Sequence, residues 1–151
     1  MKKKRKKITI GCQEWCSIPE LNIKQMRAKI DTGARTSALH AEEIQYIEKP
    51  EGAYVKFKVH PFAGEVDTKK HCVMPVSDIR PIMSSNSARE VRYIIKTKLK
   101  IGGIAFPIEL SLTNRSLMRF NILLGREALN KFAIIDPSKR YLLGPTGENS
   151  K

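Results

Sequence analysis

Apolar residues recur at every second position in several short segments of the chain, and no long segment repeats them at helical spacing. The clearest case alternates Val55, Phe57 and Val59 with the lysines Lys56 and Lys58. Such alternation predicts a strand with one buried face and one face in water. We therefore expect a mostly β protein.

Turn residues divide these segments into two predicted hairpins and a loop. Residues 44–60 form two strand-like runs around a Lys-Pro-Glu-Gly turn at 49–52, and residues 91–112 form two more around the glycine pair at 102–103. Residues 83–90 are small and polar, which indicates a connecting loop.

The last third of the sequence combines apolar runs with the best helix candidate. Residues 120–125 form an apolar strand that ends in glycine, and residues 126–132 follow as a short helix. Residues 133–136 and 141–144 are then predicted to be closing strands.

Length and composition favour one domain. The chain has 151 residues, of which 41% are hydrophobic, enough for a single core. We expect a basic disordered tail at residues 1–7, a folded domain at 8–146 and a flexible C-terminus at 147–151. No internal repeat is visible, so the chain is not a two-lobed duplication of itself.

The chain is strongly basic, with 28 Lys and Arg against 15 Asp and Glu and a net charge of +13. This balance favours acidic partners: nucleic acid, anionic lipid or an acidic polypeptide. Much of the charge lies in the unbroken basic run at 2–7, which is typical of a solvated arm. We therefore favour an acidic peptide over nucleic acid; a nucleic-acid binder would lose binding steeply with salt and on deletion of residues 1–7.

The sequence also bears on the cellular location of the protein. The residues after the basic run carry Gln13, Glu14 and Glu20 and contain no sustained apolar segment of the signal-peptide kind. Nothing has the length and hydropathy of a membrane span, and three cysteines are too few for a disulfide framework. We expect a cytoplasmic protein without a membrane partner.

The candidate chemistry lies at Asp31-Thr32-Gly33, after the apolar run that ends at Ile30. An aspartic peptidase needs two carboxylates close enough to share one proton, each held in a tight turn. Glycine permits close backbone approach in such a turn, and the threonine hydroxyl can bond across it. The tripeptide is short, so an ordinary structural turn is the alternative interpretation.

A second segment accompanies this motif. "IDTGA" at 30–34 and "LLGREAL" at 123–129 resemble the two signature segments of retropepsin-like aspartic peptidases. The segments "AKIDTGARTSALHA", "CVMPVSDIR" and "IELSLTNRSLMRFNILLGREAL", with the Trp-x-x-Ile-Pro-x-Leu stretch at 15–21, are similar to a bacterial and archaeal group labelled "ATP-dependent zinc protease". That group occurs beside or fused to ATP-grasp glutamate ligases. The likeness extends from about residue 8 to residue 144.

The resemblance implies a closed retropepsin-like β-barrel with one short C-terminal helix, and an aspartic endopeptidase that uses water as the nucleophile. It also implies three sets of site residues. They are the catalytic loop Asp31, Thr32 and Gly33, the substrate-binding residues Ala34 and Arg35, and the supporting residues Leu124, Gly125 and Arg126. We expect Arg126 to brace the helix or the dimer through an ion pair.

The number of aspartates has a direct consequence. The chain contains four, at positions 31, 67, 78 and 136, and only Asp31 is followed by Thr-Gly. A second catalytic aspartate must therefore come from another chain, as the likeness to retroviral peptidases implies. We expect a homodimer through the active site, with both copies of Asp31 facing each other and titrating together.

The substrate and the covering flap are less closely defined. The basic composition and the association with glutamate ligases suggest a peptide or protein substrate that is acidic and Glu-rich, held by Arg35 and nearby lysines. The alternative is a non-catalytic binding or regulatory module acting with an ATP-grasp ligase. The interval from Asp31 to Gly125 exceeds that of retroviral peptidases, and we expect the flap within residues 60–80.

The zinc label can be tested against the residues. No HExxH motif occurs, and the histidines and cysteines do not follow a ligand spacing. The candidate ligands are His40, His60, His71, Cys12, Cys16 and Cys72. No GxxxxGK[ST] motif for ATP is present either. We expect neither a metal site nor a cofactor.

Overall fold

The computed structural model describes residues 6–60, 70–83, 88–114 and 120–144. Strands dominate these residues, which contain one short α-helix and one turn of 3-10 helix. The elements are β1 (Ile8–Ile10), β2 (Gln13–Ile18), η1 (Pro19–Leu21), β3 (Ile23–Ile30), β4 (Ser37–His40), β5 (Glu42–Lys49), β6 (Gly52–Val59), β7 (Lys70–Pro75), β8 (Asp78–Met83), β9 (Arg89–Ile101), β10 (Ile104–Thr113), β11 (Ile122–Leu124), α1 (Arg126–Leu129) and β12 (Ala133–Ile135). Of the disordered tail predicted at 1–7, residues 1–5 lie outside the described residues, and so does the flexible C-terminus predicted at 147–151.

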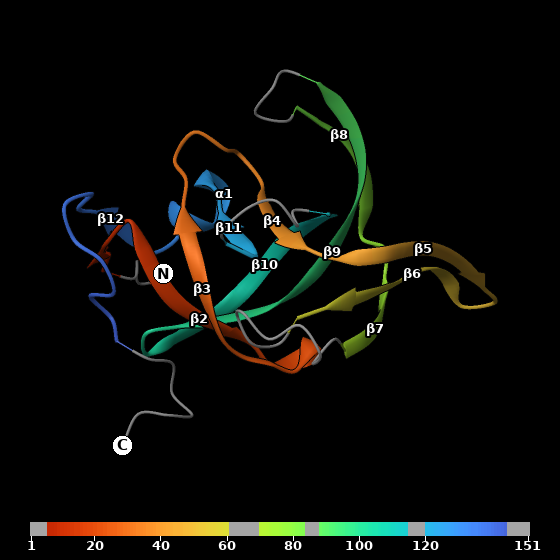
Figure 1. Ribbon diagram of the computed structural model, residues 1–151, viewed down its shortest axis with the longest axis horizontal. Helices are drawn as coiled ribbons and strands as arrows, with labels where there is room; N and C mark the ends of the chain where they lie inside the picture. The colour runs from red at the N-terminus through yellow and green to blue at the C-terminus, as the bar shows by residue number, and fades with distance from the viewer. Residues whose placement is uncertain (1–5, 61–69, 84–87, 115–119, 145–151) are drawn as a thin grey trace, which may run out of the picture.

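Six strands close into a barrel. Their order is β10-β4-β11-β3-β2-β9, and β9 returns to pair with β10. The expectation of a mostly β, closed barrel with one short helix is thus confirmed. Among the described strands, β8 pairs with β9 alone, outside the closed ring. These two strands extend beyond the barrel as a curved hairpin (Figure 1).

The barrel closes where the second predicted hairpin lies. Strands β9 and β10 are antiparallel, with Ile101 opposite Ile104 across the two-glycine turn. Gly102 has a φ of +59°, a left-handed conformation that costs glycine little. Within β9, Leu99 and Ile101 are buried and the intervening Lys100 is exposed, as strand alternation requires.

The first predicted hairpin belongs to a separate three-stranded sheet, β5-β6-β7. Lys49 pairs with Gly52 across the turn, at the position the sequence indicates. The side chains of Val55, Phe57 and Val59 are fully buried and join the core, as their alternation predicts. Figure 1 shows the β5–β6 hairpin extending away from the barrel.

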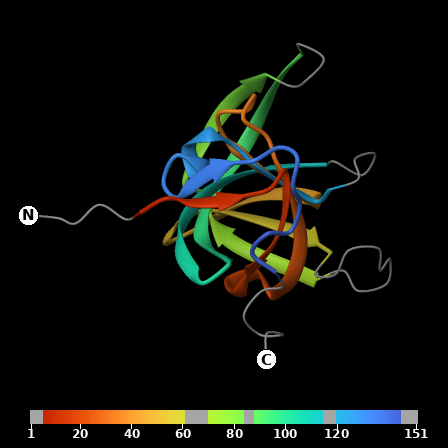
Figure 2. The same cartoon turned by 90° about the vertical axis from the view of Figure 1, so that its left-hand side faces the viewer.

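A further two-stranded pairing brings the beginning and the end of the domain together. β1 and β12 are parallel neighbours, with Ile8 opposite Ala133, and Figure 2 shows these segments side by side. No helix among the described residues has the length and apolar character needed to cross a membrane.

Several predicted boundaries are wrong. The helix predicted at 126–132 ends at Leu129, and the apolar strand predicted at 120–125 is limited to Ile122–Leu124. The loop predicted at 83–90 is wrong at both ends, because Met83 belongs to β8 and Arg89 begins β9, and residues 84–87 between them lie outside the described residues. Pairing along the β8–β9 hairpin outweighs the small, polar composition of these ends.

The closing strand predicted at 141–144 does not form, and Glu14 provides the reason. This carboxylate is fully buried. It accepts hydrogen bonds from the backbone N–H groups of Gly11, Leu142 and Leu143 at 2.8, 2.9 and 3.1 Å, respectively. Two N–H groups of the segment are therefore bonded to a side chain. Tyr141 has a φ of +56°, which also interrupts an extended strand.

Candidate active site

Asp31 follows the last residue of β3 and is held there by β11. The two strands run parallel, with Leu124 beside Ile30. The Asp31 backbone N–H donates a hydrogen bond of 2.9 Å to the Leu124 carbonyl. The apolar strand of the second motif therefore determines where the first motif leaves the barrel.

The turn orients the carboxylate of Asp31. The Gly33 N–H donates to Asp31 Oδ1 at 2.9 Å, and the Ala34 N–H donates to the Asp31 carbonyl at 3.3 Å. Asp31 is half-buried, whereas Thr32 and Gly33 are exposed. The carboxylate thus has a fixed orientation at a surface that another molecule can approach.

Gly125 allows the loop after Asp31 to dock on α1. A Cβ atom at this position would lie 2.8 Å from the Ala34 carbonyl oxygen and 3.0 Å from the Arg35 carbonyl carbon. In the space that glycine leaves open, the N–H groups of Arg126 and Glu127 donate to the carbonyls of Ala34 and Arg35 at 2.8 and 3.1 Å. The two sequence motifs therefore meet through main-chain atoms.

Two side chains complete this junction. The buried Ser37 accepts a hydrogen bond of 3.0 Å from the Gly125 N–H at its Oγ, and its carbonyl accepts one of 3.2 Å from Ser111. Arg126 donates to the Thr32 carbonyl at 2.9 Å, which ties the start of α1 to the Asp31 loop. Ser37 is a residue that the sequence analysis missed, although it lies only six positions after Asp31.

A cleft of about 600 Å³ lies beside the Asp31 loop. One wall is the loop at 33–36 with the start of α1, and the opposite wall is the end of β8 at 80–83. The β8–β9 hairpin therefore faces the loop, and both are on the same side of the barrel in Figure 1. The flap was expected at 60–80, and residues 61–69 of that range lie outside the described residues. The β8 segment that lines the cleft, 80–83, begins at residue 80, the last residue of the expected flap.

Three arginines line this cleft, at positions 35, 80 and 126. Arg35 is 78% exposed and its Nε lies 3.3 Å from Glu127. Arg80 bonds Asp78 at 2.7 Å and Glu109 at 2.9 Å, which ties the beginning of the hairpin to β10. The hydrogen bond from Arg80 holds the pKa of the Asp78 carboxyl below its ordinary value.

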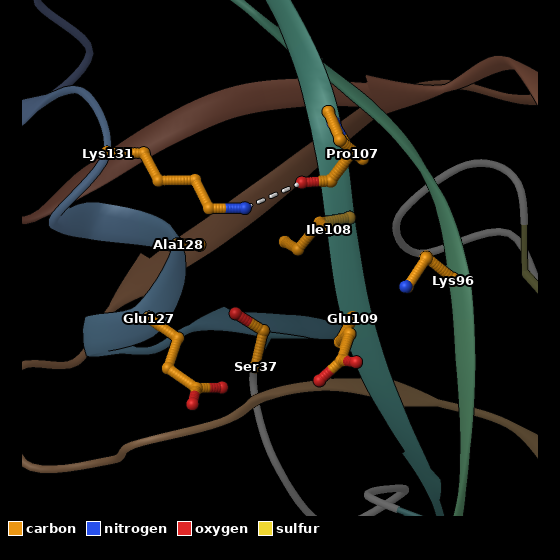
Figure 3. Close-up of a pocket in the computed structure, with 8 residues that line it drawn as sticks. All are labelled: Ser37, Lys96, Pro107, Ile108, Glu109, Glu127, Ala128 and Lys131. Carbon is orange, nitrogen blue, oxygen red and sulfur yellow. Dashed lines mark hydrogen bonds between the residues drawn. The ribbon is translucent and has the colours of Figure 1, made fainter. Parts of the chain in front are cut away.

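A second pocket of about 420 Å³ adjoins the first, because Glu127 lines both. Figure 3 shows it between α1 and β10, with Ser37 between the carboxylates of Glu127 and Glu109. Lys131 spans the pocket and donates to the Pro107 carbonyl at 3.2 Å. Both signs of charge are present, so this pocket has no clear preference for an acidic or a basic ligand.

The described residues of one chain contain a single Asp-Thr-Gly loop. Asp78 is bonded to Arg80, and Asp136 accepts hydrogen bonds from Ser138 within its own turn. Asp67 lies outside the described residues. Neither Asp78 nor Asp136 is followed by Thr-Gly, so the motif occurs once per chain.

Another cluster lies away from this loop, at the far end of β4. His40, Glu42 and His60 place one ligand atom each within 4.8 Å of one another. The sequence analysis considered both histidines but not Glu42, and it expected no metal site. The fold joins positions whose spacing in the chain gives no ligand pattern.

Comparison with known proteins places the chain in a family. Residues 9–146 match the family model described as RimB-like, retropepsin-like aspartic endopeptidase RimB. A probable alpha-L-glutamate ligase of Shewanella pealeana is 39% identical over 94% of this chain and 31% of its own length. A protein of the same description from Desulfotalea psychrophila is 43% identical over 93% of this chain and 30% of its own. The chain thus spans less than a third of these curated relatives.

The fold is also found in a solved structure. The crystal structure of a Legionella pneumophila protein of unknown function aligns with a TM-score of 0.73 at 26% identity. The alignment covers 89% of this chain and 97% of the other. The similarity therefore extends over the whole domain.

Proposed function

The chain belongs to the RimB-like family of retropepsin-like aspartic endopeptidases, and we propose that it hydrolyses peptide bonds with water activated between two copies of Asp31. One observation carries this proposal. The Asp31 carboxylate is oriented by the Gly33 N–H at 2.9 Å and lies in a partly exposed loop beside a cleft of about 600 Å³. That is where a peptide and a second carboxylate can both reach it.

The chemistry requires unequal roles for the two carboxylates. Two negative charges at close range disfavour simultaneous ionisation, so the pair holds one proton. The ionised Asp31 removes a proton from water, and the protonated one donates to the carbonyl oxygen of the substrate. The bonds made by Gly33 and Leu124 hold each carboxylate in place for this exchange.

A homodimer supplies the second carboxylate. In a two-fold symmetric dimer the same surface patch of each subunit meets its copy, so one motif per chain yields two facing aspartates. The exposure of Thr32 and Gly33 supports such an approach. The N–H groups of Arg126 and Glu127 bond the carbonyls of Ala34 and Arg35, which supports a loop that presents Asp31 in a fixed position to a second chain.

The cleft suggests an acidic substrate. Arg35, Arg80 and Arg126 line it, and guanidinium groups bind carboxylates through paired hydrogen bonds. Curated relatives are named as probable alpha-L-glutamate ligases, which motivates a Glu-rich peptide as the substrate and a ligase as the functional partner. The net charge of +13 favours the encounter with such a peptide.

The test compares the full chain with Asp31→Asn on poly-glutamate and on a basic control peptide. We expect the variant to lose activity by at least about a hundredfold, because an amide cannot serve as the base. Asp136→Asn is the matched control, since Asp136 lies in a turn outside the cleft. Equal cleavage by Asp31→Asn would refute the catalytic role, and preference for the basic peptide would refute only the substrate class.

Mixing the two proteins tests the dimer. If each active unit contains two intact aspartates, an equal amount of Asp31→Asn halves the activity per wild-type chain, to about 50%, by random pairing. Adding Asp136→Asn in the same amount leaves the activity per chain that carries Asp31 unchanged, because every pairing then contains two intact copies of Asp31. Activity that is insensitive to Asp31→Asn would indicate a site complete within one chain.

A second candidate function is a binding or regulatory module that acts with a glutamate ligase without hydrolysis. The observation that favours it is that relatives named as ligases contain this domain as only 30–31% of their length. Such a module would bind poly-glutamate without cleaving it and with equal affinity in Asp31→Asn. A chain that remains a strict monomer at micromolar concentration in light scattering would also favour this function.

A further inference from the structure

Two histidines and one glutamate converge at the end of β4 that is remote from Asp31. His40 is the last residue of β4, Glu42 is the first of β5, and His60 follows the last residue of β6. Ser37 and His40 are the two ends of β4 and lie three positions apart, a span of about 10 Å at the usual rise of a strand. The cluster is therefore separate from the proposed peptidase centre.

The donor atoms are arranged around a common point. The Nε2 atoms of His40 and His60 lie 2.9 and 3.2 Å from the same oxygen, Oε2 of Glu42. The two rings are stacked, with centroids 5.6 Å apart and planes inclined by 17°. Each imidazole thus directs its Nε2 atom toward the same carboxylate oxygen of Glu42.

These separations match what a transition metal requires. Bonds of about 2.0–2.2 Å in a tetrahedral arrangement place neighbouring ligand atoms roughly 3.3 Å apart. The two distances to Glu42 are close to that spacing, and all three atoms lie within 4.8 Å of one another. Small rotations of the side chains would place an ion between them.

We propose that His40, Glu42 and His60 form a binding site for a divalent transition metal such as Zn²⁺, outside the peptidase centre. Two imidazole nitrogens and one carboxylate oxygen form a donor set suited to Zn²⁺ and unsuited to Ca²⁺ or Mg²⁺, which prefer oxygen ligands. Three protein ligands leave a fourth position for water.

Burial and charge support this assignment. The side chain of His40 is only 3% exposed, whereas His60 and Glu42 are 15% and 20% exposed, so an ion can enter from one side. The nearby Lys58 is bonded to Glu43 at 3.0 Å, and its charge is thereby partly neutralised.

The location indicates what the metal would do. His40 belongs to the barrel, where it pairs with Thr113 of β10, whereas Glu42 and His60 belong to strands of the three-stranded sheet or follow them. A bound ion would connect the two sheets and stabilise the folded chain, because the unfolded chain offers no preformed site. This site is independent of whether Asp31 is catalytic.

The experiment uses the full chain after removal of metal with a chelator, titrated with Zn²⁺ by calorimetry. We expect one ion per chain and a rise in melting temperature. The variants His60→Gln and Glu42→Gln are expected to weaken binding by about tenfold or more and to lose the rise. His71→Gln is the matched control, because His71 is an exposed histidine on β7 outside the cluster.

Cobalt substitution distinguishes this site from the cysteines. Co²⁺ bound by His40, Glu42 and His60 gives visible d–d bands without a thiolate charge-transfer band, and Cys72→Ser leaves the spectrum unchanged. A cluster that is only hydrogen-bonded would bind no metal at equimolar concentration, which would overturn the proposal. Undiminished affinity in both His60→Gln and Glu42→Gln, with native circular dichroism, would overturn it as well.

Discussion

The two walls of the cleft beside Asp31 are built in different ways. On one wall, the loop at 31–36 is bonded to β11 and α1 through main-chain groups, with the buried Ser37 beneath it. On the other wall, β8 pairs with one of the described strands, β9, and the half-exposed side chain of Arg80 ties it to β10. The first wall has little freedom to move, whereas the second has few contacts that resist motion.

The two walls also differ in their exposed apolar side chains. Met83 and Val91, on the β8–β9 hairpin, are 60% and 70% exposed although both are apolar. Met83 also lines the cleft, whereas the loop bonded to β11 and α1 orients the carboxylate of Asp31. Different parts of the chain therefore orient Asp31 and border the cleft beside it: the loop bonded to β11 and α1, and the β8–β9 hairpin.

The largest expected effect comes from Gly125→Ala. The new Cβ would meet the Ala34 oxygen at 2.8 Å, a main-chain atom that cannot move without disturbing the loop. We expect a loss of about 2–3 kcal/mol in the free energy of unfolding, measured by urea denaturation.

The matched control for this substitution is Gly103→Ala, because a Cβ there would meet no atom within 4 Å. It is expected to change the free energy of unfolding by less than about 0.5 kcal/mol. Equal losses in the two variants would show that the loop wall is not rigid.

A smaller effect is expected from Ser37→Ala. The substitution removes the acceptor of the Gly125 N–H, which lies in a buried junction. We expect a loss of about 1–2 kcal/mol, since an unsatisfied buried donor retains its desolvation cost. Ser77→Ala, at an exposed position, is the control, and both are measured by thermal unfolding. A neutral Ser37→Ala would mean that the main-chain bonds alone hold the wall.

The smallest expected effect on stability is the loss of the Asp78–Arg80 ion pair on β8 when the pH is lowered. Because Arg80 lowers the folded-state pKa of Asp78 below the unfolded value of 3.8, the stabilisation is present above that value and is lost as pH falls through the folded pKa. Carboxyl NMR titration should give a midpoint below 3.8 for Asp78, moving upward in Arg80→Gln.

The melting temperature of Arg80→Gln should change far less than that of Ser37→Ala, because exposed ion pairs contribute little to stability. A drop as large as that of Ser37→Ala would show that the two walls are equally well anchored. Asp136 provides the internal reference for the titration. Its pKa is lowered by hydrogen bonds from Ser138 and should not respond to Arg80→Gln.

Much of the fold could be predicted because neighbouring residues encode it. The alternation at Val55, Phe57 and Val59 reports a strand with one buried face, and the glycine pair at 102–103 marks a turn. The strand predicted at 141–144 failed for the opposite reason. Glu14, more than a hundred residues earlier in the chain, bonds the N–H groups that a strand would need.

The candidate site divides in the same way. The sequence by itself determined that Asp31 follows a strand, that Gly33 belongs to a tight turn, and that the motif occurs once per chain. Only the tertiary structure decided that β8 faces the loop, that Ser37 supports Gly125, and that Glu42 joins two histidines. Turns and strands depend on residues adjacent in the chain, whereas these contacts depend on strand register and barrel closure, which no local pattern specifies.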